Sequence, residues 1–199
     1  MFTDCFIKLT LASTLFTQKL NIKAMFKLGL LVCLMLLAVV EAREVCVDSE
    51  LNLSEQSNLA EKLFYRGTCH YRNGDYHLAA NNWRGLADLE QVDPNYKDLQ
   101  ISALSNLAYL MFFGLNIEAD QPLALEYWGR AVAMGNKEAQ YHLCHAQADK
   151  DAGSYNPKLA LPHCLEAFQI YNSVEEKDES DLTILKQIEF YIESIEAKN

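Results

Sequence analysis

Glycine and proline are scarce in this chain, which has 8 glycines and 4 prolines among 199 residues. An all-β fold with many turns needs more of both. The chain also lacks the Gly-x-Ser-x-Gly and His-Glu-x-x-His motifs and any glycine-rich phosphate loop, which several large enzyme classes require. We therefore expect an all-α protein that is not an enzyme and holds no cofactor.

Basic residues are fewer than acidic ones. The chain has 17 lysines and arginines and 27 aspartates and glutamates, which give a formal net charge of −10. Such a charge repels nucleic acid and anionic lipid surfaces. Half of the residues are apolar, so a chain of this length can bury the core of one domain. We expect a partner other than nucleic acid and no insertion into a membrane once the export segment described below is removed.

The metal-binding spacings Cys-x-x-Cys and His-x-x-x-His are absent as well. Adjacent residues on an α-helix point about 100° apart, so neighbouring cysteines and histidines are poorly placed to share one zinc ion. We expect no metal site, although a metal- or redox-responsive module stays as an alternative hypothesis. It would use Cys69-His70, Cys144-His145 and His163-Cys164, with His142 nearby.

Residues 28–40 form an uncharged apolar run that follows Lys27. These 13 residues are too few to cross a hydrocarbon core of about 30 Å as a helix. The run ends in Val40-Glu41-Ala42, a small-x-small pattern typical of signal-peptidase sites. We interpret residues 1–42 as an N-terminal extension and secretory signal peptide, with Met25 as the expected start and cleavage after Ala42. The alternative is a retained anchor helix.

Cleavage after Ala42 would leave a net charge of −12 and four cysteines: Cys46, Cys69, Cys144 and Cys164. An even number of cysteines in an exported chain favours disulfide bonds in an oxidising compartment. Four cysteines allow three pairings. We expect an exported protein, with the periplasm as its compartment.

Apolar residues recur at helical spacing through most of the remaining chain. Turn and cap residues divide it: Asn73-Gly74, Asp93-Pro94, Gly114 and Gly135 are typical of breaks, and Asp120 of a helix N-cap. Asn52 with Glu55 matches a capping box for the first helix. The pattern predicts seven helices, over about 53–71, 78–89, 99–113, 121–134, 137–149, 157–171 and 181–198.

A 36-residue repeat begins at Ala103 and recurs at Ala139. The matches fall at small or apolar positions and at one N-cap, as packed helix pairs require. A shorter relative precedes this unit. The matched positions are Ala103 with Ala139, Leu107 with Leu143, Asp120 with Asn156, Ala124 with Ala160 and Ala131 with Ala167, and the earlier unit carries Gly67, Gly74, Ala79 and Trp83.

Residues 103–139 resemble a Sel1-like repeat, and residues 60–90 resemble the related tetratricopeptide repeat. The resemblance to the tetratricopeptide repeat rests on Gly67, Gly74, Ala79 and Trp83. The resemblance to the Sel1-like repeat rests on the run from Ala103 to Gly114 and on Asp120, Ala124, Tyr127-Trp128, Ala131, Gly135-Asn136 and Ala139. The third unit departs, since Lys150 replaces the loop glycine and His163-Cys164 replaces the aromatic pair.

The resemblance implies a right-handed α-α superhelix, a short solenoid of about three helical hairpins. The hairpins would occupy 58–92, 99–135 and 136–171 within a repeat region of 58–172. An N-terminal segment over 43–57 and a capping helix over 180–199 would flank them. The apolar stripe of that last helix could instead dock a partner.

The resemblance also implies a pairing of the cysteines. In the repeat register, Cys144 takes the place of Ala108 and Cys164 takes the place of Trp128. These positions face each other across a hairpin of the family, which implies a Cys144–Cys164 disulfide. Cys46–Cys69 then follows by elimination and would attach the N-terminal segment to the first helix.

In tetratricopeptide-type folds, the first helix of each hairpin lines the inner face that contacts other proteins. Aromatic residues with an arginine suit such an interface. The hypothesis is therefore a periplasmic adaptor or scaffold for a protein or peptide, with a structural subunit of a cell-envelope assembly as an alternative. Carried over by register, the binding face would hold Phe64, Tyr71, Arg72, Tyr109, Phe112, Phe113, Tyr141 and His145.

Overall fold

A computed structural model describes residues 43–197 of the chain. The predicted signal peptide lies outside the described residues. Helices α3 to α9 belong to one compact unit, which begins at Glu44. In the described part there is no strand, and the helices are α3 (Leu59–Arg72), α4 (Tyr76–Ala87), α5 (Lys97–Phe113), α6 (Gln121–Ala133), α7 (Lys137–Ala148), α8 (Pro157–Asn172) and α9 (Glu179–Glu196), with a short 3-10 turn η1 (Pro94–Tyr96) before α5.

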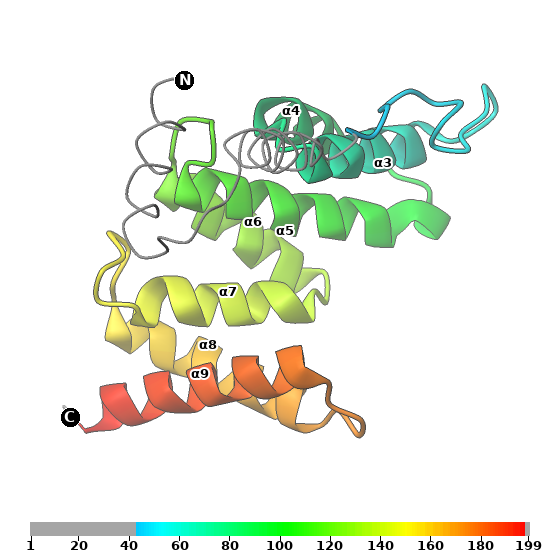
Figure 1. Cartoon of the computed structure of the whole chain (residues 1–199). Coiled ribbons are helices and arrows are strands. Elements are labelled where there is room, and N and C mark those ends of the chain that lie inside the picture. Colours follow the sequence, from blue (N-terminus) through cyan, green and yellow to red (C-terminus); the bar gives the residue numbers. More distant parts are fainter. Residues whose placement is uncertain (1–42, 198–199) are drawn as a thin grey trace, which may run out of the picture. The chain divides into compact units, whose positions relative to one another are not determined.

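Each helix packs against its neighbours in the chain, and three successive pairs form hairpins. Helix α3 packs on α4, α5 on α6, and α7 on α8. Two further contacts skip one helix along the chain, since α3 contacts α5 and α7 contacts α9. Figure 1 shows α5, α7 and α9 one after another in the same order as in the sequence.

Most of the predicted helix ends are found within two residues of their observed positions, because polar caps fix them locally. The side chain of Asp120 accepts a hydrogen bond from the backbone N–H of Leu123 at the start of α6. Gly114 ends α5 in the left-handed conformation, with φ of +64°, which glycine adopts without steric cost. Asn156 caps α8 in the way expected from its match with Asp120.

The predicted start of the first helix was wrong. Helix α3 begins at Leu59, six residues after the prediction, and Asn58 with Glu61 forms its capping box. Asn52 instead has a φ of +56° and lies in a series of turns. Both Asn-x-x-Glu sequences match the local signal, but Arg66 pairs with Asp48 and thereby holds the residues before Asn58 back along α3.

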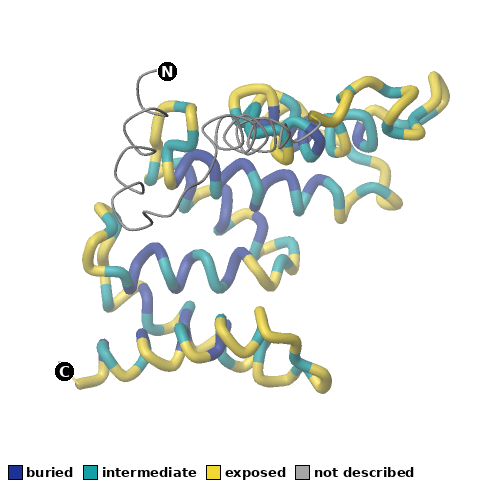
Figure 2. The backbone as a smooth tube through the Cα atoms, viewed as in Figure 1, coloured by how far each residue is buried: buried dark blue, intermediate teal, exposed yellow. Residues whose placement is uncertain are grey.

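Two clusters of buried residues form the core. The larger one extends from α3 to α7, and the smaller one joins α7, α8 and α9. Helix α5 has more buried residues than any other described helix, and they appear as dark blue stretches in Figure 2. The alanines matched in the 36-residue repeat are fully buried, and they are Ala103, Ala124, Ala131, Ala139, Ala160 and Ala167.

Helix α9 packs its apolar stripe against the last hairpin. Leu185, Ile188 and Ile195 are buried, and α9 contacts both α8 and α7. Leu182, which the periodicity placed on the same stripe, is 47% exposed. In the described part of the chain, no helix is both long and apolar enough to cross a membrane.

Helices α3 and α4 approach so closely at Gly67 that a larger residue does not fit. A Cβ atom at this position would lie 2.6 Å from Cδ1 and Nε1 of Trp83, whose side chain is almost fully buried. We expect Gly67→Ala to lower the free energy of unfolding by about 1–3 kcal/mol through overpacking, measured by urea denaturation.

Gly129 provides the matched control. It lies inside α6, and an added Cβ would meet no atom within 4 Å. Gly129→Ala should raise the free energy of unfolding by up to about 1 kcal/mol, because alanine has the higher helix propensity. Equal effects of the two substitutions would contradict the close contact between Gly67 and Trp83.

Candidate functional site

A groove of about 490 Å³ crosses the first helices of the three hairpins. Helix α3 contacts α5, so side chains near the end of α3 lie beside the middle of α5, and the first turns of α7 complete the groove. Its lining combines aromatic rings with small polar groups and two oppositely charged side chains. The lining residues are Thr68, Tyr71, Arg72, Trp83, Ser105, Asn106, Tyr109, Glu138 and His142.

Ring contacts hold the aromatic residues of the groove in place. The centroid of the Tyr71 ring lies 5.6 Å from that of Trp83, and Tyr109 lies 5.9 Å from His142. The His142 ring stacks on Trp128 at 4.9 Å with an interplanar angle of 19°. Trp128 is itself fixed, because its Nε1–H donates to the backbone oxygen of Ser105. The aromatic surface therefore exists before any ligand binds.

The charged residues of the groove lie on different helices. Arg72, on α3, has its Nη1 atom 3.6 Å from Oε2 of Glu44. Glu138, on α7, has its Oε1 atom 3.7 Å from Nε2 of His142, and this neighbour lowers the pKa of the Glu138 carboxyl. Burial raises the pKa of Tyr71. At neutral pH the groove thus offers a cation, a carboxylate and a neutral phenol.

The structure brings together three of the predicted binding residues. Tyr71, Arg72 and Tyr109 line the groove. Phe112 is buried against Trp128, and Phe64 packs against the larger core cluster. These two residues therefore serve packing, as expected for some members of a helical face.

The other predicted binding residues lie beyond the groove lining. Phe113 is exposed next to Tyr109, with their ring centroids 4.8 Å apart. Tyr141 lies between Glu138 and His142 on α7 but does not line the groove, and its ring packs against Tyr171 on α8. His145 lies farther along α7 and contacts the last helix. Nδ1 of His145 is 2.7 Å from the hydroxyl of Tyr191 on α9, and the rings of Tyr141 and His145 stack at 6.1 Å.

Several groove residues were missed by the sequence analysis. The most informative are Glu138 and His142, which lie four residues apart on α7. Residues at this spacing share a helix face, and His142 stands 36 positions after Asn106, the groove residue at the same place in the preceding unit. The repeat register relates His142 to Asn106, and Glu138 shares the helix face of His142, but Asn106 was itself not predicted, so neither position could be assigned to the groove from the sequence.

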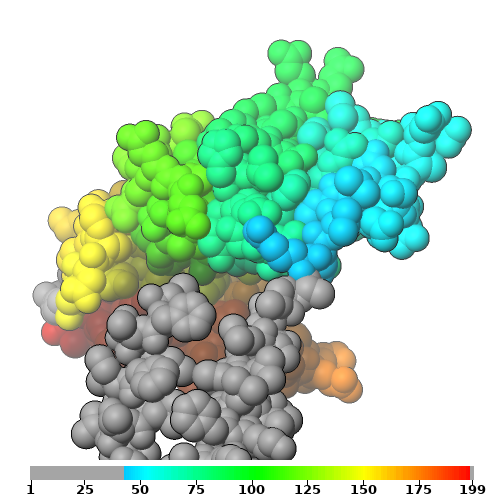
Figure 3. All heavy atoms as spheres, turned by 45° about the horizontal axis from the view of Figure 1, so that its top comes forward, coloured from blue at the N-terminus to red at the C-terminus, as the bar shows by residue number. Residues whose placement is uncertain are grey.

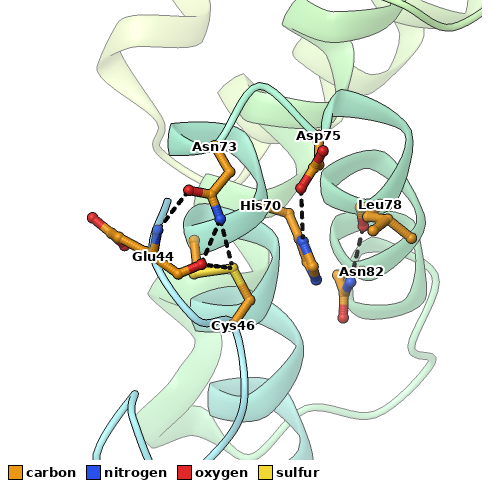
Figure 4. Close-up of polar contacts among 8 residues, drawn as sticks. Glu44, Cys46, His70, Asn73, Asp75, Leu78 and Asn82 are labelled. Atoms are coloured by element: carbon orange, nitrogen blue, oxygen red, sulfur yellow. Dashed lines mark hydrogen bonds and ion pairs between the residues drawn. A yellow bond between two sulfur atoms is a disulfide. The ribbon is translucent and has the colours of Figure 1, made fainter. Parts of the chain in front are cut away.

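The N-terminal segment is attached to the end of α3 beside the groove. Cys46 is bonded to Cys69. The Asn73 side chain accepts from the backbone N–H of Glu44 at 2.9 Å and donates to its carbonyl oxygen at 2.8 Å. Figure 4 shows these contacts, and the space-filling view shows the segment, in blue, against the cyan surface of the first helix (Figure 3). Glu44 is thus held close to Arg72.

A second disulfide joins Cys144 on α7 to Cys164 on α8. Both residues are fully buried. The two bonds join the same pairs that the repeat resemblance implies. Since disulfides form and persist in oxidising environments, they favour a compartment outside the reducing cytosol.

Among residues 43–197, no three His, Cys, Asp or Glu side chains lie close enough together to hold a metal ion. All four cysteines of this part of the chain are in disulfide bonds. Thiolate coordination would therefore require reduction first.

Comparison of the chain with protein-family models, curated proteins and solved structures finds no match.

Loss of the buried disulfide should destabilise the last hairpin. We expect the double substitution Cys144→Ala and Cys164→Ala to lower the free energy of unfolding by about 3 kcal/mol, because the bond closes a loop of 20 residues. Urea denaturation measures the change, and an unchanged midpoint would contradict it.

The pair Cys46→Ala and Cys69→Ala serves as the comparison. It should increase hydrogen exchange in residues 44–57 and leave that of residues 157–172 unchanged, because this bond anchors only the N-terminal segment. Equal changes in both regions would show that the two bonds do not act locally.

The stability of the domain should fall in mild acid. Burial lowers the pKa of both His145 and His163 in the folded chain. The unfolded chain therefore binds more protons just below pH 6.5, the ordinary histidine value, and the free energy of unfolding decreases as the pH falls through this range. His145→Gln should flatten the decrease and His145→Gln with His163→Gln should flatten it further, measured by urea denaturation between pH 7.5 and 5. The same pH dependence in all three proteins would refute this origin.

Proposed function

We propose that the protein is an exported, periplasmic adaptor or scaffold that binds a protein or peptide in the groove across α3, α5 and α7. The observation that carries the proposal is the groove itself, in which Tyr71, Tyr109 and Arg72 gather from two hairpins. Aromatic residues and arginine contribute most to protein interfaces. The ring contacts fix the surface in advance, which lowers the entropy cost of binding.

The proposal includes a right-handed α-α superhelix of the Sel1 and tetratricopeptide kind. Its support is the order of three hairpins followed by α9 and the burial of alanines at the 36-residue spacing. In such folds each hairpin contacts mainly its neighbours, and terminal elements with a polar outer face cover the ends. Helix α9 would cover one end of the array, and the disulfide-anchored N-terminal segment would cover the other.

Export to the periplasm is supported by the apolar run over residues 28–40 and by the two disulfides. The negative net charge of the chain argues against nucleic acid and anionic membranes as partners. A protein or peptide is the class of partner that suits a preformed aromatic groove of this size.

A permanent subunit of a cell-envelope assembly is the second candidate function. It is favoured by Phe190, which lies on α9 and is 59% exposed. A permanent interface covers large apolar residues of this kind. A stoichiometric complex that survives high salt and is lost in Phe190→Ser would favour this function over the adaptor.

Selection from a random peptide library displayed on phage tests the groove. The bait is the purified protein with its disulfides intact. We expect the selected peptides to bind at least tenfold more weakly to Asn106→Trp, because a bulky side chain would fill the groove. Fluorescence polarisation with labelled peptides measures the affinities.

Asn81→Trp is the matched control, since Asn81 is exposed on α4 and does not line the groove. This variant should bind as the unchanged protein does. Peptides that bind all three proteins equally would place binding outside the groove and contradict the proposed function.

A further inference from the structure

The two charged residues of the groove differ in their electrostatic surroundings. Arg72 lies close to a carboxylate of its own chain, that of Glu44. Glu138 has only His142 beside it, and a histidine carries a charge only when it is protonated. In the described part of the chain, no lysine or arginine forms an ion pair with Glu138. The negative charge in the groove is therefore less compensated than the positive one.

The Glu44 backbone is held beside Arg72. It is hydrogen-bonded on both sides to the Asn73 side chain, and Cys46, two residues later, is covalently bonded to α3. A ligand carboxylate approaching Arg72 would have to compete with a carboxylate whose backbone is already held in place (Figure 4). This arrangement disfavours an anionic ligand.

The carboxylate of Glu138 is accessible and lies among aromatic groups. Its side chain is 64% exposed. His142, four residues along the same helix, has its ring 5.9 Å from that of Tyr109. An aromatic face next to a carboxylate is the chemistry that binds an organic cation.

We propose that the groove recognises a cationic side chain of its partner, an arginine or a lysine, which lies against the ring of Tyr109 and contacts the carboxylate of Glu138. This inference rests on the proposed function and names the chemistry of the partner. Arginine fits better than lysine, because its planar guanidinium stacks on aromatic rings and donates two parallel hydrogen bonds to a carboxylate. The net charge of −10 attracts such a partner from a distance.

The same peptide selection provides the test. We expect the selected peptides to share an arginine or lysine, and replacement of that residue by glutamine to weaken binding about tenfold. Glu138→Gln should weaken binding by a similar factor. Together the two changes should weaken binding no more than either alone, because both remove one contact.

Glu126→Gln is the matched control. Glu126 is an exposed glutamate on α6 and does not line the groove, so its substitution changes the net charge equally and should leave the affinity unchanged. Circular dichroism would verify the helical content of both variants. Replacing the cationic residue of the peptide tests its contact with Glu138 without changing the protein, so this test holds even if Glu138→Gln disturbed the fold.

Two outcomes would overturn the inference in different ways. The first concerns peptides that bind the Asn106→Trp variant more weakly but whose affinity does not depend on a cationic residue or does not depend on Glu138. Such peptides would refute the cation site and leave the groove as the binding site. Selected peptides that are all insensitive to Asn106→Trp would refute the proposed function, and the cation site with it.

Discussion

Close approach between helices, made possible by small side chains, is the constraint on which the rest of this structure depends. Alanines without exposed surface lie on every helix from α4 to α8, and Gly67 serves the same purpose on α3 against Trp83. The tryptophans fill the space that these small residues leave. Close packing of this kind leaves little space for the helices to shift. The first helices of successive hairpins therefore have a fixed spacing.

The groove is a direct consequence of that spacing. Trp128 lies on a second helix, yet its ring stacks on His142 of the next hairpin, and His142 in turn lies next to Tyr109 of the hairpin before. One buried ring therefore orients groove residues from two different units. The proposed cation site uses this arrangement, because the carboxylate and the aromatic face come from separate helices.

The two disulfides differ in their surroundings. Cys144 and Cys164 are buried where the third hairpin lacks the aromatic pair of the second. Cys46 holds a segment without helical structure beside α3, and this places Glu44 near Arg72. The Cys46–Cys69 bond thereby affects the electrostatics of the groove as well as the stability of the N-terminal segment.

The sequence by itself determined the helical class, the order of the helices and most of their ends, because capping residues such as Asp120 and Gly114 act within a few residues of the chain. Only the tertiary structure decided where α3 begins, since Asn52 and Asn58 carry the same local signal but only Asn58 forms the capping box, and the segment before it is joined to α3 through Asp48 and Arg66 and through the Cys46–Cys69 bond. It also decided the membership of the groove. Tyr71 and Tyr109 could be expected from their helix faces. His142 joins them because its ring stacks on Trp128 of the preceding hairpin, and Glu138 lies beside His142 on the same helix face; local periodicity does not encode a contact between hairpins.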